Sequence, residues 1–111
     1  MGGYEFMVVQ LPDEVRRLEN CGKFSLAKKL VEKMLKDERV EGLLRLRLEW
    51  ELERIRRVLF DFRLSKKEAL EELRKYVPDA DESDLERWTE KGYAEWRLVE
   101  GEIRYFRRFA P

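Results

Sequence analysis

The segment from Ala94 to Phe109 alternates apolar and charged side chains around a single glycine, Gly101. A two-residue turn at Glu100-Gly101 would place four of its apolar side chains on one face of a β-hairpin. Those four residues are Trp96, Leu98, Ile103 and Tyr105. A three-residue turn would set Trp96 opposite Arg104 and mix the two faces. Because strand register follows the apolar face, we predict the two-residue turn, with Glu100 at positive φ and a helix covering the apolar face.

Two sequences typical of capping boxes precede the hairpin. Ser65-Lys66-Lys67-Glu68 and Ser83-Asp84-Leu85-Glu86 each place a serine three residues before a glutamate. Each side chain of such a pair can bond the backbone amide of the other residue, which starts a helix. Pro78 is expected to end the first helix and Gly92 the second. Two helices and a hairpin in this order predict a winged-helix-like unit over residues 64–111.

The preceding residues 11–63 predict three helices. The first is short and is expected to stop at Gly22. The second is expected from Phe24 to Lys36 with Ser25 as its N-cap, because apolar residues recur there at helical spacing. The third and longest is expected from Glu38 to Phe62, and it should form an antiparallel helical hairpin with the second.

The predicted fold class is therefore mainly α with a C-terminal β-hairpin, an α+β arrangement. A chain of 111 residues is of the size of one domain. We expect residues 11–111 to form one compact domain. Residues 1–10 are expected to be a flexible segment or a short edge strand.

Apolar residues lie on two sides of the long third helix. One stripe consists of Leu44, Leu48, Leu52, Ile55 and Leu59. The second stripe consists of Val40, Leu43, Leu46, Trp50 and Val58. A helix that is apolar on two sides has to be covered on two sides. We therefore expect the second stripe to contact a protein partner, a domain that follows this segment in its own polypeptide, or a second copy of the chain.

Charge argues against nucleic acid as the main partner. The chain carries 24 basic and 24 acidic residues, whereas general binders of DNA or of anionic membranes have a basic excess. The second helix of the winged-helix-like unit is acidic, and phosphates would repel it in a major groove. The alternative, a nucleic-acid-binding module, would use the basic hairpin. Its candidate contacts to phosphate or another anion are Arg97, Arg104, Arg107 and Arg108.

The sequence offers no evident candidates for catalytic residues. It contains no histidine and one cysteine, Cys21, which therefore lacks the usual base of a nucleophile. The acidic run from Asp79 to Asp84 lacks the glycine that a calcium loop needs. We expect no catalytic residue, metal or cofactor, and hence no enzyme.

Cysteine usage and apolar runs bear on location. One cysteine allows no internal disulfide, and no apolar run is long enough for a membrane span, so we expect a cytoplasmic protein. Charged residues make up 43% of the chain, and Asn20 and Gln10 are its only side-chain amides. That composition is typical of heat-adapted proteins.

One stretch of sequence resembles a known family. The residues that carry the resemblance are Glu68-Ala69-Leu70, Asp84-Leu85-Glu86, Lys91-Gly92 and the run from Val99 to Phe109. They are similar to the segment that precedes the catalytic core in bacterial and archaeal transglutaminase-like proteins, whose cores have the papain-like cysteine-protease fold. The resemblance covers about Phe24 to Pro111 and is strongest from Glu90 to Phe109. It implies an accessory or substrate-recognition domain, cut off before the core that would carry the catalytic Cys, His and Asp.

Overall fold

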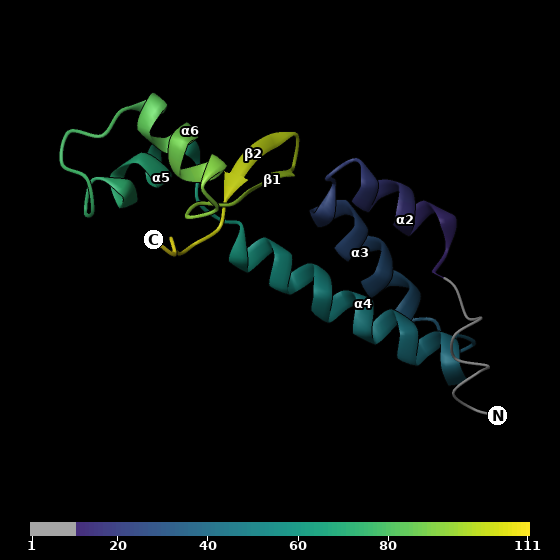
Figure 1. Ribbon diagram of the computed structural model, residues 1–111. Coiled ribbons are helices and arrows are strands. Elements are labelled where there is room, and N and C mark those ends of the chain that lie inside the picture. The colour runs from purple at the N-terminus through teal and green to yellow at the C-terminus, as the bar shows by residue number, and fades with distance from the viewer. Residues whose placement is uncertain (1–10) are drawn as a thin grey trace. The chain divides into compact units, whose positions relative to one another are not determined.

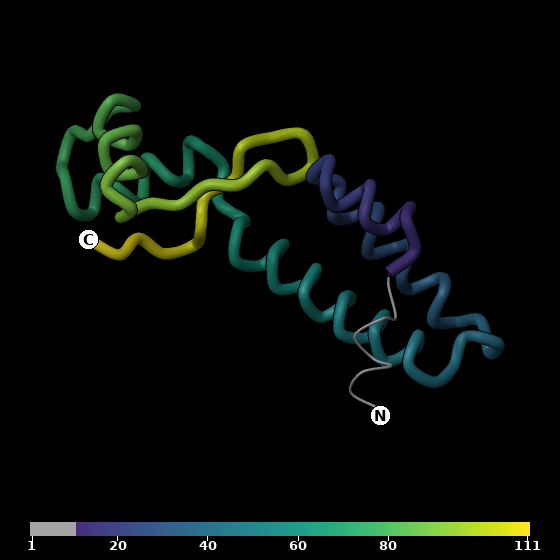
Figure 2. The backbone as a smooth tube through the Cα atoms, turned by 45° about the vertical axis from the view of Figure 1, so that its right-hand side comes forward, coloured from purple at the N-terminus to yellow at the C-terminus, as the bar shows by residue number. Residues whose placement is uncertain are grey.

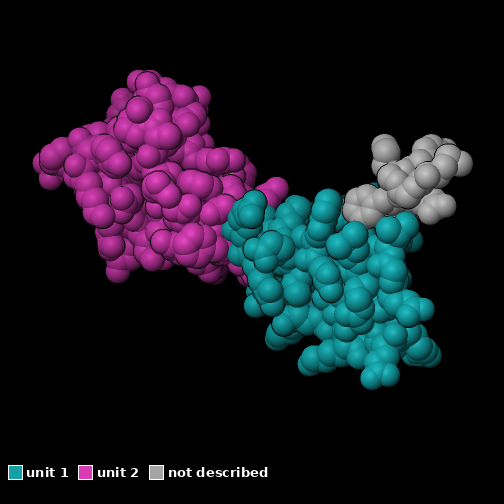
Figure 3. Space-filling model, turned by 90° about the horizontal axis from the view of Figure 1, so that it is seen from below, with its two compact units in different colours: residues 1–58 teal, residues 59–111 magenta. Residues whose placement is uncertain are grey.

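Five helices precede a two-stranded antiparallel hairpin in the computed structural model, which describes residues 11–111 (Figure 1). The chain divides into two compact units, residues 1–58 and residues 59–111 (Figure 3). The elements are α2 (Asp13–Asn20), α3 (Phe24–Leu35), α4 (Gly42–Asp61), α5 (Lys66–Leu73), α6 (Glu82–Glu90), β1 (Trp96–Val99) and β2 (Glu102–Tyr105). The predicted fold class is confirmed. The expectation for residues 1–10 falls outside the described residues, and the expectation of one domain over 11–111 stays a prediction.

The first unit is built on α2, α3 and most of α4. Val15, Ala27 and Val31 are fully buried on the first two helices, and α4 buries Leu48 and Ile55. Gly22 ends α2 as predicted, with a left-handed φ of 74°. The chain reverses between α3 and α4, so these helices run antiparallel (Figure 2).

One predicted N-cap and one predicted helix start in this unit are wrong. Helix α3 begins at Phe24 as predicted, but its N-cap is Lys23 rather than Ser25. Helix α4 begins at Gly42 rather than at Glu38. The reason lies at Asp37, whose carboxylate accepts the backbone amide of Arg39 (2.9 Å) and its guanidinium (2.8 Å). This local turn competes with a helical start, and the same hydrogen bonds hold the pKa of Asp37 below its usual value.

In the second unit, one capping box is as predicted and the other begins earlier. The hydroxyl of Ser65 accepts the amide of Glu68 (3.2 Å), and the Glu68 carboxylate accepts the amide of Ser65 (3.1 Å). Asp81, not Ser83, is the N-cap of α6 and forms a reciprocal pair with Asp84 (3.0 and 2.9 Å). The Asp81 amide, together with the Arg87 guanidinium, holds the pKa of Asp84 below its usual value. The prediction of Ser83 as the N-cap was wrong because Asp81, two residues earlier, has the extended backbone and the side-chain acceptor that an N-cap requires.

Helix α5 is shorter than predicted. It ends at Leu73, well before Pro78, and a turn follows in which the Val77 amide donates to the Leu73 carbonyl (2.9 Å). Asp79 takes a left-handed φ of 63°, and Arg74 donates to the Ala80 carbonyl (3.1 Å). These contacts close the connection to α6. Helix α6 ends before Gly92, which has a φ of 81°, as predicted.

The hairpin has the predicted register. Trp96 lies opposite Tyr105, Arg97 opposite Arg104, and Leu98 opposite Ile103. Glu100 and Gly101 both have positive φ, at 57° and 75°, as a two-residue turn of this hand requires. The hairpin is tied back to the start of the unit by a bridge between Leu64 and Tyr105 (2.8 and 3.3 Å).

The core of the second unit combines both helices, the hairpin and the segment after it. Its buried members are Ala69, Leu73, Ala80, Leu85, Ala94, Tyr105 and Phe109. Half-buried Leu64, Leu70, Val77 and Trp88 pack against them. Helix α5 therefore contributes its buried face, α6 contributes Leu85, and the hairpin contributes only Tyr105.

The N-caps of α5 and α6, Ser65 and Asp81, should each contribute measurably to the free energy of unfolding. Ser65→Ala and Asp81→Ala should each lower the free energy of unfolding by about 1 kcal/mol, because each leaves a helix amide without its acceptor. Ser83→Ala is the matched control and should change it by less than about 0.5 kcal/mol. Chemical denaturation of the three variants measures this order. A larger loss for Ser83→Ala than for Asp81→Ala would show that the cap has been placed wrongly.

Candidate interaction surface

The apolar face of the hairpin is largely uncovered, contrary to the expectation that a helix lies over it. Trp96, Leu98 and Ile103 are 49%, 45% and 48% exposed, whereas Tyr105 is buried at 7%. The turn end of the hairpin projects away from α5 and α6, whose buried side chains meet the sheet at Tyr105 (Figure 1). The helices are thus too short to cover the face, and three large apolar side chains remain together at the surface.

A groove of about 320 Å³ separates this face from α6. Trp96, Ile103 and Tyr105 line it on the hairpin side, and the buried Leu85 of α6 also lines it. On the helix side it is lined by Glu82, Glu86 and Glu90, which recur every fourth residue and share one face of α6. The groove therefore has an apolar side and an acidic side.

Acidic side chains outnumber basic ones along the groove. Lys66 pairs with Glu82 (3.1 Å) at one end. Among residues 11–111, neither Glu86 nor Glu90 forms an ion pair. Three glutamates thus face one lysine, and the uncompensated charge lies at Glu86 and Glu90. Burial raises the pKa of the Tyr105 phenol above its ordinary value, with Glu86 and Glu82 adding to the shift and Lys66 opposing it.

The second stripe of α4 does not form one surface. Leu46 and Trp50, one turn apart, are 40% and 61% exposed, and Leu43 is half-buried. Val40, also half-buried, lies before the start of α4. Val58 is buried at 7%. Of the five predicted interface residues, the structure leaves Leu46 and Trp50 accessible and places Val58 on the inward side of the helix.

The inward side of α4 also holds a buried carboxylate, Glu51, which the sequence pattern does not predict. Glu51 is 2% exposed and accepts hydrogen bonds from Arg47 (3.0 Å) and Arg54 (2.8 Å). Arg54 also pairs with Glu19 of α2. Buried charges need such partners to offset their lost hydration. This cluster therefore connects α2 to α4 and is explained by its own ion pairs.

The four arginines proposed as anion contacts are mostly engaged within the chain. Arg104 pairs with Glu102 (2.8 Å), which offsets the like charge of Arg97 across the hairpin. The guanidinium of Arg97 lies 5.6 Å from the ring centre of Phe62. Arg107 pairs with Asp61 (3.0 Å) and lies over the Phe60 ring (5.1 Å).

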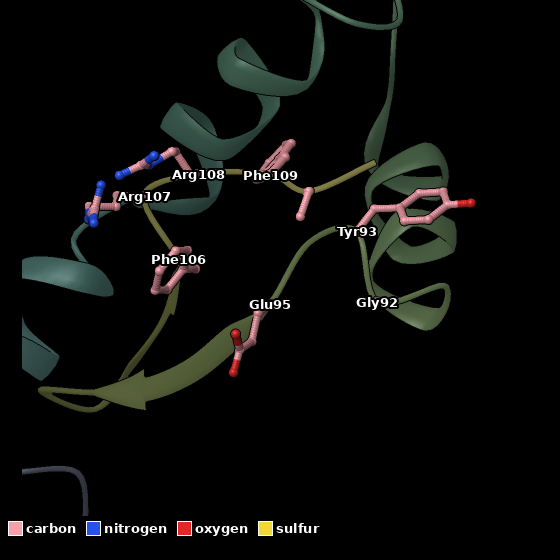
Figure 4. Close-up of a pocket in the computed structure, with 8 residues that line it drawn as sticks. Gly92, Tyr93, Glu95, Phe106, Arg107, Arg108 and Phe109 are labelled. Atoms are coloured by element: carbon pink, nitrogen blue, oxygen red, sulfur yellow. The ribbon is translucent and has the colours of Figure 1, made fainter.

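A second hollow, of about 400 Å³, lies where the residues after α6 meet the residues after β2 (Figure 4). The guanidinium groups of Arg107 and Arg108 lie on the far side of it from the Tyr93 ring and the Glu95 carboxylate (Figure 4). Backbone bonds from Phe106 to Glu95 (2.7 Å) and from Ala110 to Tyr93 (2.8 Å) close the connection. Its polar groups do not converge on one point, as a binding site for a small anion would require.

Within residues 11–111, no three acidic or cysteine side chains are grouped so that they could hold a metal ion. Cys21 is exposed at the end of α2. In that same range, no helix combines the length and the apolar character that crossing a bilayer demands.

The sequence does carry a signal for the groove, which is separate from the argument against DNA. The glutamates of α6 repeat at four-residue intervals and therefore share one face of the helix. Comparison of the chain with models of known protein families, with curated proteins and with solved structures finds no match. The chemistry of the surface itself is therefore the basis for a function.

Proposed function

We propose that this chain is a non-catalytic protein-interaction domain that binds its partner through the apolar face of the hairpin. The observation that carries the proposal is the exposure of Trp96, Leu98 and Ile103 side by side on one sheet face. Single exposed apolar residues are ordinary, but a contiguous group of large ones is typical of a contact surface. Tryptophan is also enriched among the residues that dominate binding energy.

Leu46 and Trp50 on α4 are a secondary contact in this proposal, because they are exposed one turn apart. The resemblance to the segment before transglutaminase-like cores supports an accessory role beside such a core, in the same polypeptide or in another. Cysteine usage supports a cytoplasmic setting, and composition supports a heat-adapted source.

Two of the four arginines on which the nucleic-acid alternative depends already form ion pairs within the chain, which weakens that alternative. Arg104 and Arg107 are paired with carboxylates, so phosphate contact would require breaking ion pairs that already exist. Labelled duplex DNA at low and moderate salt is its direct test. Tight binding with a steep salt slope, abolished by Arg97→Ala with Arg104→Ala, would replace the interaction-domain proposal.

The proposal predicts which residues a selected ligand will need. Peptides selected from a random displayed library against the whole chain should bind the double variant Trp96→Ala/Ile103→Ala at least about tenfold more weakly, because both side chains lie on the apolar face. Leu46→Ala/Trp50→Ala is the comparison variant and should weaken binding less. If selection enriches no peptide, or if the enriched peptides bind the Trp96/Ile103 variant as well as the wild type, the proposal fails.

A further inference from the structure

The groove beside the hairpin face has two sides of opposite chemistry, and this constrains what can fill it. Trp96 and Ile103 offer apolar surface, while Glu86 and Glu90 offer carboxylates that have no ion pair among residues 11–111. A purely apolar ligand would remove these carboxylates from water without a partner, which is unfavourable. A purely basic ligand would leave the apolar side in contact with water. The occupant must therefore be apolar toward the hairpin and cationic toward α6.

The spacing of the carboxylates indicates the backbone conformation of that occupant. Glu86 and Glu90 are one helical turn apart, which places their Cβ atoms about 5–6 Å from each other. In an extended peptide, residues i and i+2 point to the same side about 6.6–6.8 Å apart, and the residue between them points to the other side. Alternating basic and apolar residues would thus face both sides of the groove at once.

The size of the groove limits how much of a partner it can hold. A volume of about 320 Å³ lies at the lower end of ligand pockets and accommodates a few side chains rather than a domain surface. The Lys66–Glu82 ion pair occupies one end, so a ligand cation is favoured toward Glu86 and Glu90 instead.

We propose that the groove between α6 and the hairpin binds an extended peptide segment in which basic and apolar residues alternate. The basic side chains pair with Glu86 and Glu90, and the apolar ones lie on Trp96 and Ile103. This inference rests on the proposed interaction function and adds the chemistry of the partner. It requires no residue of α4 and none of the hairpin arginines.

The test uses the whole chain and three labelled six-residue peptides. The first alternates lysine and leucine, the second has the same composition with the lysines and leucines in separate blocks, and the third alternates glutamate and leucine. Fluorescence anisotropy should give the alternating lysine peptide an affinity at least about tenfold higher than either of the others. Raising the salt concentration should weaken its binding, because exposed charges are screened.

Charge reversal on α6 provides the critical variant. Glu86→Lys/Glu90→Lys should weaken binding of the alternating lysine peptide at least about tenfold. Glu49→Lys/Glu53→Lys is the matched control, because it makes the same charge change at the same spacing on exposed positions of α4. That control should bind within about twofold of the wild type. Glu86→Gln/Glu90→Gln should weaken binding of the alternating lysine peptide by an intermediate factor, which keeps the test valid if the lysine variant unfolds.

Three results of the peptide titrations would each overturn the inference, and one result on self-association would do so as well. The block peptide could bind as tightly as the alternating lysine peptide. The α4 control variant could lose as much affinity for the alternating lysine peptide as the α6 variant does. The alternating lysine peptide could bind no more tightly than the glutamate peptide. In each case the interaction function still stands if library-selected peptides require Trp96 and Ile103. If self-association of the chain, measured by light scattering, blocks the groove and is abolished by Trp96→Ala, a second copy is the occupant and the peptide proposal is wrong.

Discussion

Leu73→Ala is expected to lower the free energy of unfolding by about 2–5 kcal/mol, whereas Leu98→Ala should lower it by less than about 1 kcal/mol. The two substitutions remove the same atoms from the same unit. Leu73 is fully buried on α5 in the core of the second unit, so its loss leaves a cavity. Leu98 is 45% exposed on the hairpin, so its removal leaves little empty volume.

Urea denaturation followed by far-ultraviolet circular dichroism measures both variants. The pair is informative because it compares the core with the proposed contact surface. If Leu98→Ala were as destabilising as Leu73→Ala, the hairpin face would be part of the core in solution. The exposed surface on which the proposed function depends would then not exist.

Phe109→Ala is the second substitution with a large expected effect, a loss of about 3–5 kcal/mol. Phe109 follows the hairpin and is 6% exposed within the core of the second unit. Its ring centre lies 5.9 Å from that of Trp88 and 6.5 Å from that of Tyr76. Removing the ring takes away both aromatic contacts and leaves a cavity beneath α6.

Phe60→Ala serves as the control for Phe109→Ala, because Phe60 is 55% exposed and its ring lies beside the guanidinium groups of Arg63 and Arg107. It should cost less than about 1 kcal/mol. Comparable losses at the two positions would mean that the segment after β2 does not complete the core. Thermal unfolding at fixed pH separates the two cases.

The hairpin was predictable because its information is local. Alternation, a glycine and an opposing pair of apolar residues determine the register within ten residues, and the observed pairing of Trp96 with Tyr105 agrees with it. The capping box at Ser65 was predictable for the same reason. The predicted helix starts were wrong where another residue or turn competed with them. Asp81 is the N-cap of α6 in place of Ser83, and the turn at Asp37 moves the start of α4 to Gly42.

The candidate surface was less predictable because it depends on distances between elements. The pattern showed that the hairpin has an apolar face, but not that α5 and α6 cover it only at Tyr105. Likewise, the predicted stripe on α4 includes both Trp50 and Val58, although Trp50 lies at the surface and Val58 is buried. The groove requires the glutamates of α6 to face the hairpin, and no single segment of sequence contains that relation.

Chemical-shift mapping by nuclear magnetic resonance tests directly whether the apolar face of the hairpin is the contact surface. The whole ¹⁵N-labelled chain would be titrated with a peptide selected against it. We expect the largest amide shifts at Trp96, Leu98 and Ile103 and at neighbouring residues of α6. Shifts concentrated on residues 43–50 of α4, or on Arg104 to Arg108, with the hairpin face unchanged, would contradict it.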